Sequence, residues 1–346
     1  MEAVFFATLR CMDFLENTTL QSIFKVSNEN FDSLAIDLFN FQYEQNETYR
    51  KYCDAIHCKA LSVKAIEDIP YLPISFFKSK EVKTTCFDTS TIFESSGTTG
   101  INTSRHFVKD LSIYKKSFLE TFELFYGEVT KYCIIGLLPS YLERSHSSLV
   151  MMTNDLIIRS GNVESGFYLY DHAKLHQTLL INEAKQQPTI LIGVTYALLD
   201  FADKYPMRLK HTIVMETGGM KGRNKELTRE EVHTTLRLQL GVSKVHAEYG
   251  MTELLSQAYS KDNGHFYSPP WMKVLARSED DPFEVRTAYA IPKGIMGAAN
   301  IIDFANVYSC CFIATDDVIR LYPDGNFEVL GRLDNSDLRG CGLMII

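Results

Sequence analysis

The sequence contains one stretch that decides its fold, Phe93-Glu94-Ser95-Ser96-Gly97-Thr98-Thr99-Gly100. The β-branched and apolar segment Thr91-Ile92-Phe93 leads into it and predicts a strand. Glycine lets successive N–H groups converge on one point, and serine and threonine hydroxyls add donors without bulk, so such a loop suits a phosphate group. The glycines are three residues apart and no lysine follows, which does not match the usual P-loop. A flexible connection rich in serine, threonine and glycine stays open as the alternative.

Length and composition favour a globular enzyme that acts on small molecules. The chain has 346 residues, enough for two or three subdomains that each bury a core. Hydrophobic residues make up 45% of the chain and charged residues 23%, so disorder is not expected. The net charge is −8 and there is no long run of lysine and arginine, which argues against nucleic acid or an anionic membrane surface as the main partner.

The cysteines are expected to be reduced and the protein cytoplasmic. No C-x-x-C pair or zinc-finger spacing occurs, and the N-terminal residues lack the basic start of a signal peptide. No uncharged run approaches the roughly 20 residues that span a bilayer, so no membrane span is expected. Cys53 and Cys58, with His57 between them, allow a metal interpretation, but unrelated buried thiols are favoured. The eight cysteines are Cys11, Cys53, Cys58, Cys86, Cys133, Cys310, Cys311 and Cys341.

The sequence predicts three parts. Residues 1–68 contain no proline and repeat apolar residues at three- and four-residue spacings, which predicts a helical N-terminal part. Pro70 and Pro73 break this pattern. Residues 69–260 are expected to form an α/β core. Residues 261–346 are expected to form a β-rich subdomain with a truncated C-terminus, because short alternating segments there flank turns such as Asp324-Gly325.

The predicted core alternates short apolar strands with amphipathic helices. Asp110 is a candidate cap for a helix that ends at Gly127. Thr228 and Glu231 form a candidate capping box for a helix that ends near Gly241. Fully apolar strands are typical of a sheet that is buried on both faces. The expected strands are residues 132–138, 189–194, 212–215 and 244–247.

Four polar clusters follow predicted strands, and ligands of open α/β sheets bind beyond the carboxyl ends of strands. The first is the Ser/Thr/Gly loop. The second, residues 216–223, has a glycine pair that would let a flat ring approach the backbone. The third, residues 247–253, supplies an aromatic ring to stack a base and a carboxylate for a divalent cation. The fourth, in residues 315–334, offers aspartates for ribose hydroxyls. Each cluster taken singly is also explained as a turn with exposed charges.

The order of these motifs resembles that of the adenylate-forming superfamily, which includes the acyl-CoA synthetases. The motifs are Ser-Ser-Gly-Thr-Thr-Gly, Gly-Gly, Tyr-Gly-x-Thr-Glu, Thr-x-Asp and Gly-Arg-x-Asp. The chain is most similar to the branch of phenylacetate-CoA ligases and bacterial acyl-protein synthetases, on the segments 72–78, 218–223 and 338–341. The resemblance implies an α/β adenylate-forming large-domain fold with a small C-terminal β-rich subdomain and without the full C-terminal lid domain.

The resemblance also implies a reaction, in which ATP and Mg2+ convert a carboxylic acid, expected to be a fatty acid, to an acyl adenylate. Arg105 is a candidate phosphate cation, because the Pro-Lys that follows the loop in relatives is absent here. The implied phosphate-binding residues are Ser95, Ser96, Gly97, Thr98, Thr99 and Gly100. The implied nucleotide-binding and catalytic residues are Gly218, Gly219, Tyr249, Gly250, Asp317 and Arg332, with Thr252 and Glu253 at the α-phosphate and Glu253 also as the ligand of Mg2+.

Cys341 is the implied acyl acceptor. In acyl-protein synthetases the acyl group passes to a cysteine near the C-terminus, and a cation such as Arg339 would favour the reactive thiolate. Relatives that make acyl-CoA carry a further domain with a lysine, whereas this chain ends 12 residues after Asp334. The expected acceptor is therefore Cys341 or a thiol of a partner, such as a reductase or a carrier protein. A small hydrophobic cysteine in an apolar tail remains the alternative.

Two other classes of function stay open. The chain could bind nucleotide without turnover, as a degenerate relative that retains the fold. It could also be an acyl-CoA ligase that needs a separate chain for the missing domain.

Overall fold

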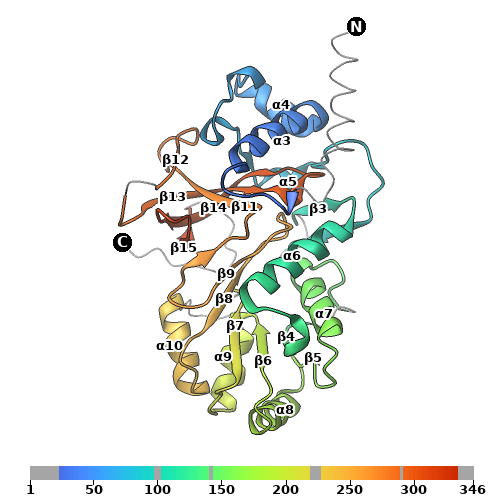
Figure 1. Cartoon of the computed structure of the whole chain (residues 1–346), viewed down its shortest axis with the longest axis vertical. Coiled ribbons are helices and arrows are strands. Elements are labelled where there is room, and N and C mark those ends of the chain that lie inside the picture. The colour runs from blue at the N-terminus through green and yellow to red at the C-terminus, as the bar shows by residue number, and fades with distance from the viewer. Residues whose placement is uncertain (1–22, 97–102, 140–142, 219–226, 289–290, 334–346) are drawn as a thin grey trace.

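A thirteen-stranded mixed sheet runs through the molecule (Figure 1). The computed structural model describes residues 23–96, 103–139, 143–218, 227–288 and 291–333. The strand order is β12-β11-β13-β14-β15-β10-β9-β8-β7-β6-β4-β5, with β1 paired to β14, and β2 and β3 form a separate hairpin. The mixed α/β architecture agrees with the predicted fold class.

One half of the sheet is parallel and covered on both faces, as its apolar strands predict. Helices α6 and α7 pack on the face that carries Ile134, whereas α8, α9 and α10 pack on the face that carries Ile135. All five residues of β4 and of β6 are buried. The last parallel strand, β8, begins at His246, two residues later than the predicted strand 244–247. The parallel strands are β4 (Cys133–Leu137), β5 (Gly166–Phe167), β6 (Thr189–Gly193), β7 (Thr212–Glu216) and β8 (His246–Tyr249).

Two of the helices around this half, α6 and α10, begin and end at the predicted caps. Asp110 accepts a hydrogen bond from the N–H of Ser112, and Gly127 follows the helix with φ of 79°. The Thr228 capping box is confirmed, and Gly241 ends that helix in the left-handed conformation. The helices are α6 (Leu111–Tyr126), α7 (Ser148–Ser160), α8 (His172–Ala184), α9 (Thr195–Lys204) and α10 (Arg229–Leu240).

The other half of the sheet is antiparallel. The predicted hairpin around Asp324-Gly325 is confirmed, since Leu321 pairs with Phe327 and Gly325 has φ of 83°. Strand β10 pairs with both β9 and β15. The sheet therefore continues past residue 260, where the α/β core was predicted to end. The strands are β1 (Leu72–Pro73), β9 (Ala258–Ser260), β10 (Phe266–Tyr267), β11 (Met272–Arg277), β12 (Val285–Arg286), β13 (Ile295–Asp303), β14 (Phe312–Leu321) and β15 (Phe327–Arg332).

Helices α3 and α4 cover the antiparallel half, at the upper part of Figure 1. The buried Gln42 side chain donates to the carbonyls of Asn306 and Val307 and accepts from the N–H of Cys311. The ring of Phe31 stacks on that of Phe304. The helical N-terminal part thus shares its core with the sheet. These helices are α3 (Phe31–Gln45) and α4 (Glu47–Ala55), and the remaining elements are α5 (Phe76–Ser79), β2 (Thr91–Glu94), β3 (Arg105–Val108), η1 (Ala60–Ser62), η2 (Ile66–Asp68), η3 (Val129–Lys131) and η4 (Phe304–Asn306).

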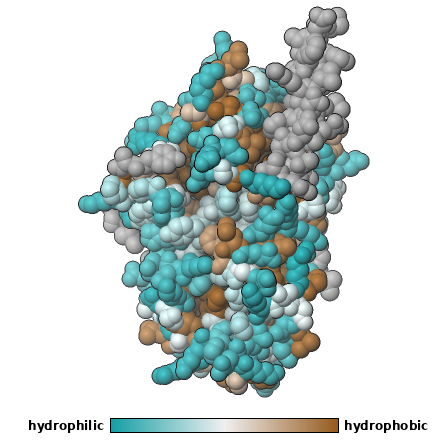
Figure 2. Space-filling model, in the orientation of Figure 1, coloured by the Kyte–Doolittle hydropathy of each residue, from teal (hydrophilic) through white to brown (hydrophobic). Residues whose placement is uncertain are grey.

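On the face drawn in Figure 2, hydrophilic side chains predominate and apolar ones are scattered among them. None of the helices in the described ranges combines the length and the apolar composition needed to cross a bilayer. Cys53, Cys310 and Cys311 are buried in the core.

Candidate active site

A cavity of about 210 Å3 lies where the parallel and antiparallel halves of the sheet meet. It brings together residues from three of the four predicted clusters. The lining residues are Ile74, Glu216, Thr217, Gly218, Arg229, Glu248, Tyr249, Gly250, Met251, Glu253, Phe266, Thr315, Asp317, Val329 and Arg332. The predicted site residues Gly97, Thr98, Thr99, Gly100, Gly219 and Cys341 lie outside the described residues.

The residues expected at the ribose form a connected group with the residue expected at the adenine. The Tyr249 hydroxyl donates a hydrogen bond to Asp317 Oδ2 at 2.8 Å. Arg332 Nε lies 3.5 Å from Asp317 Oδ1, because the two residues face each other on β15 and β14. Burial first, and then the Asp317 charge, raise the pKa of Tyr249, so its phenol stays protonated as a donor. The group therefore presents an aromatic ring and a carboxyl group to the cavity.

The loop that follows Tyr249 is held by a buried aspartate. Asp303 Oδ2 accepts from the N–H groups of Leu255 and Ser256, both at 2.9 Å. Its Oδ1 accepts from the Ser256 hydroxyl at 2.6 Å and from the N–H of Ala305 at 3.0 Å. Four donors on one carboxyl fix the loop relative to the antiparallel strands.

Two further side chains hold Thr252 and Glu253 by their backbone carbonyls. The Asn306 amide donates to the Glu253 carbonyl at 2.8 Å. His106 Nδ1 donates to the Thr252 carbonyl at 2.9 Å, and its Nε2 accepts from the Ser309 hydroxyl. Burial lowers the pKa of His106 to about 4, so the ring is neutral and this tautomer is retained. The Glu253 side chain is fully buried and lines the cavity.

A smaller pocket continues toward the Ser/Thr/Gly loop. It shares Glu253 and Arg332 with the main cavity and adds Lys78 and Ser104. The N–H of Ser104 donates to the hydroxyl of Ser95, the first residue of the predicted phosphate loop. The start of that loop is therefore joined to the smaller pocket through Ser104, although Ser95 and Ser96 do not line either pocket.

Arg105 and Thr252 are placed differently from the other predicted residues. The exposed Arg105 guanidinium lies over the ring of Phe107, 5.5 Å from its centroid, and does not line the cavity. Thr252 adjoins the cavity through its neighbour Glu253 but is not a lining residue. Phosphate contacts of both residues stay predictions.

A buried carboxylate, Glu216, forms part of the cavity wall. Its Oε2 accepts from the Thr195 hydroxyl at 2.9 Å and from the N–H of Gly218 at 2.7 Å. Its Oε1 lies 3.6 Å from both Arg229 Nε and His233 Nε2. Burial raises the pKa of Glu216, but these partners outweigh it and lower the pKa to about 2. Glu216 is therefore ionised in the folded protein.

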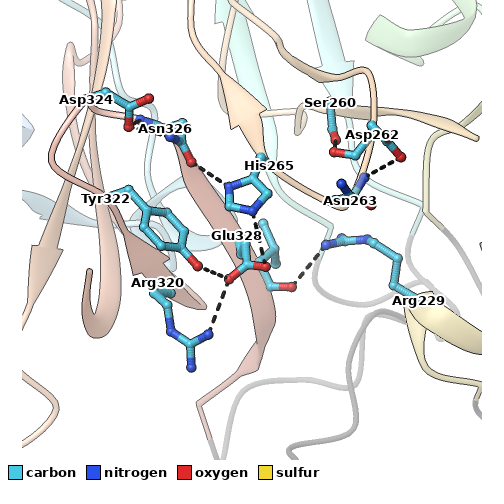
Figure 3. A network of polar contacts seen from close by, with 11 residues as sticks. Arg229, Ser260, Asp262, Asn263, His265, Arg320, Tyr322, Asp324, Asn326 and Glu328 are labelled. Atoms are coloured by element: carbon cyan, nitrogen blue, oxygen red, sulfur yellow. Dashed lines mark hydrogen bonds and ion pairs between the residues drawn. The ribbon is translucent and has the colours of Figure 1, made fainter. Parts of the chain in front are cut away.

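A polar network ties the segment just before β10 to the last hairpin (Figure 3). His265 Nδ1 bonds to Asn326 Oδ1 at 2.8 Å, and Glu328 accepts from the Tyr322 hydroxyl at 2.7 Å. Arg229 donates to the carbonyl of Val329 at 3.1 Å. Since Arg229 also pairs with Glu216, it joins α10, β7 and β15 around the cavity.

The sequence placed Glu216 and Glu248 in the second and third polar clusters but assigned neither a role. It missed Arg229 as a cavity residue, and Asp303 and His106 as supports of the loop. One signal was available for Arg229, which is the first residue of α10. A cation is unfavourable at the N-terminus of a helix because the helix dipole is positive there, so an acidic partner for Arg229 could have been expected. No local signal marks Asp303 or His106, because their partners lie 47 and 146 residues away in sequence. Among the described residues, no group of three histidine, cysteine, aspartate or glutamate side chains is arranged for a metal ion.

Comparison with known proteins supports the resemblance found from the motifs. The family model described as "Acyl-protein synthetase, LuxE" matches residues 19–346. The "Long-chain-fatty-acid--luciferin-component ligase" of Aliivibrio fischeri is 26% identical, over 92% of this chain and 89% of that protein.

Solved structures share the fold. The ATP-bound MatB of Rhodopseudomonas palustris is similar with a TM-score of 0.52 and 18% identity, over 71% of this chain and 48% of that chain. An ATP-bound chimera, RpMatB-BxBclM, gives a TM-score of 0.52 and 14% identity over the same shares. This chain thus spans about half the length of these structures. The adenylate-forming fold class is confirmed.

Proposed function

Because the chain belongs to the acyl-protein synthetase family LuxE, we propose that it uses ATP to activate a fatty acid as an acyl adenylate and passes the acyl group to a protein thiol. The observation that carries the proposal is the cavity in which Tyr249, Glu253, Asp317 and Arg332 meet. These four residues come from three motifs that are separated in sequence and match the motif order of adenylate-forming enzymes.

The proposed first half-reaction needs positioning and charge stabilisation rather than a side-chain nucleophile. An oxygen of the fatty acid carboxylate attacks the α-phosphorus of ATP, the bond from that phosphorus to the β-phosphate oxygen breaks, and pyrophosphate leaves. Tyr249 stacks on the adenine and Asp317 accepts from the ribose hydroxyls. Arg332 neutralises Asp317 and faces the phosphate side. These roles place donors and a cation where negative charge gathers.

Mg2+ is proposed to bind at Glu253, where it would supply a charge that offsets the repulsion between carboxylate and phosphates. The buried Glu253 carboxylate suits this ion, because Mg2+ prefers carboxylate and phosphate oxygens and needs few protein ligands when phosphates supply the rest. The backbone bonds from Asn306 and His106 hold the residue that carries this carboxylate.

In the proposed second half-reaction, the thiolate of Cys341 attacks the acyl carbonyl, a thioester forms and AMP leaves. A partner thiol, of a reductase or a carrier, is the further destination of the acyl group. The choice of a fatty acid follows from the name of the Aliivibrio fischeri relative, a long-chain-fatty-acid ligase, and the choice of a protein acceptor follows from the description of the family as acyl-protein synthetases.

Exchange of labelled pyrophosphate into ATP tests the first half-reaction. A panel of saturated fatty acids of increasing length and one aryl acid is assayed, and acid-dependent exchange is expected. ATP binding without exchange for any acid would instead support a nucleotide-binding protein without turnover.

Mass spectrometry after incubation with ATP and labelled acid tests the second half-reaction. Cys341→Ser is expected to retain exchange but to lose the protein thioester. The exposed Cys86 offers a matched control, and Cys86→Ser is expected to keep the thioester. Label that persists in Cys341→Ser would exclude Cys341 as the acceptor, and acyl-CoA formed by the isolated protein would favour a CoA ligase.

A further inference from the structure

Glu248 is one of the carboxyl residues that line the cavity, and it lies on the opposite face of β8 from Tyr249. Successive residues of a strand point to opposite faces, and Tyr249 points toward Asp317 and Phe327. Glu248 instead lies opposite Tyr259 in the pairing of β8 with β9. It therefore lines the part of the cavity away from the proposed ribose contacts.

Aromatic side chains surround Glu248 on this face, and the Lys261 ammonium lies over the ring of Tyr126, 5.5 Å from its centroid. Burial first, and the Glu248 carboxyl after it, raise the pKa of Tyr114 on α6 and of Tyr259 on β9, so their phenols stay neutral. Tyr126 of α6 is near as well, and its hydroxyl bonds to His246 at 3.1 Å. Burial lowers the pKa of His246 to about 4, so it brings no charge.

The Glu248 carboxyl has no polar partner within the described part of the chain, since none of those residues donates a hydrogen bond to it or pairs with it. Its position depends on Gly250. A Cβ atom at residue 250 would lie 2.4 Å from Glu248 Oε1. The carboxyl therefore folds back along the cavity wall into the space left by glycine, and it stays partly exposed to the cavity.

The charged group that acts on this carboxyl is itself negative. Burial, and then the ionised Glu216, raise the pKa of Glu248 to about 8. The cation on that side, Arg229, is already paired with Glu216. Across the cavity, Arg332 is paired with Asp317. A carboxyl in this setting keeps its proton at neutral pH and is a hydrogen-bond donor that lacks an acceptor.

We propose that Glu248 is the residue that receives the acid substrate: its protonated carboxyl donates a hydrogen bond to one carboxylate oxygen of the acid, and its ionised form repels the acid. The other carboxylate oxygen is left free to attack the α-phosphorus. The two carboxyls share a single proton, as when two such groups occupy one site. This inference rests on the proposed function, because it assigns a contact to the acid of that reaction.

The pH dependence of pyrophosphate exchange tests the contact. With the acid of the panel that has the lowest KM, the KM of the wild type for that acid is expected to rise about tenfold from pH 7 to pH 9, as Glu248 loses its proton around pH 8. Glu248→Gln keeps a donor at every pH, so its KM stays low and flat. Glu248→Leu lacks a donor, so its KM is raised at every pH and is also flat.

Glu328→Gln is the matched control, because Glu328 belongs to the network in Figure 3 and does not line the cavity. It is expected to keep the wild-type rise in KM. A wild-type KM that does not change between pH 7 and pH 9, or a Glu248→Gln variant that keeps the rise, would overturn the inference. Either result leaves the proposed activity intact, whereas absence of exchange at every pH refutes the activity itself.

Calorimetry of acid binding without ATP gives a readout that does not need turnover. Binding at pH 8, measured in buffers of different ionisation enthalpy, is expected to take up about half a proton in the wild type, because about half of Glu248 is ionised there. Glu248→Gln is expected to bind without proton uptake. Equal uptake in both proteins would assign the proton to another group and overturn the inference.

Discussion

Replacement of Glu216 by glutamine is expected to remove a charge on which the cavity wall depends. An oxygen at the Oε2 position still accepts from Thr195 and Gly218. The amide nitrogen then faces Arg229 and His233, where the carboxylate lay 3.6 Å from each. The change therefore deletes the ion pair with Arg229 and leaves the hydrogen bonds from Thr195 and Gly218 in place.

The magnitude follows from the pKa of Glu216, which is about 2 in the folded protein and 4.5 as its ordinary value. Each pKa unit corresponds to 1.36 kcal/mol, so the ionised form contributes about 3 kcal/mol to folding at neutral pH. Loss of one partner of a buried ion pair costs about 3–5 kcal/mol in other proteins, which agrees. Since the folded pKa is depressed, the contribution is present above about pH 4.5 and is lost as the pH falls toward 2.

Urea unfolding at several pH values measures this contribution. The single tryptophan, Trp271, is buried and reports unfolding by its fluorescence. Glu216→Gln is expected to be about 3 kcal/mol less stable than the wild type at pH 7, and this difference is expected to shrink to about 1 kcal/mol at pH 3. Glu230→Gln, on the exposed side of the same helix as Arg229, is the control and is expected to leave the unfolding midpoint nearly unchanged. A difference that stays constant from pH 7 to pH 3 would refute the reasoning.

Three other substitutions probe the site, the sheet and the N-terminal helices. Tyr249→Phe removes a hydrogen bond to the charged Asp317, which is expected to cost about 1.5 kcal/mol and to raise the KM for ATP about tenfold in the exchange assay. Gly297→Ala would bring a Cβ atom to 2.4 Å from the carbonyl oxygen of Arg277, and urea unfolding is expected to show a loss of about 3 kcal/mol. Gln42→Ala leaves three buried backbone groups without their partner, and is expected to cost about 3 kcal/mol or more in the same experiment.

Each of these has an outcome that contradicts it. An unchanged KM for ATP in Tyr249→Phe would mean that Asp317 does not need the phenol to be positioned. For Gly297→Ala, the control is Gly161→Ala, because a Cβ atom there meets nothing within 4 Å and only the positive φ is strained. Equal losses at the two glycines would contradict the steric argument. A stability loss in Gln42→Ala no larger than that of an exposed alanine substitution would show that α3 is not fixed through this side chain.

The sequence by itself determined the parts of this protein that depend on neighbours along the chain. The apolar strands, the Asp110 and Thr228 caps and the Asp324-Gly325 turn are local patterns, because periodicity and capping involve residues a few positions apart. The motif order also indicated the family, and with it Tyr249 and Asp317 as members of one site.

Only the tertiary structure decided which charges the cavity contains and what they are next to. Glu216 and Glu248 are both strand residues of the same chemical type, yet one is ionised by Arg229 and the other keeps its proton because it lacks such a partner. The same is true of the loop with Glu253, whose supports come from distant segments. Burial and long-range pairing set the protonation of a carboxyl, and neither is encoded by the residues beside it in sequence.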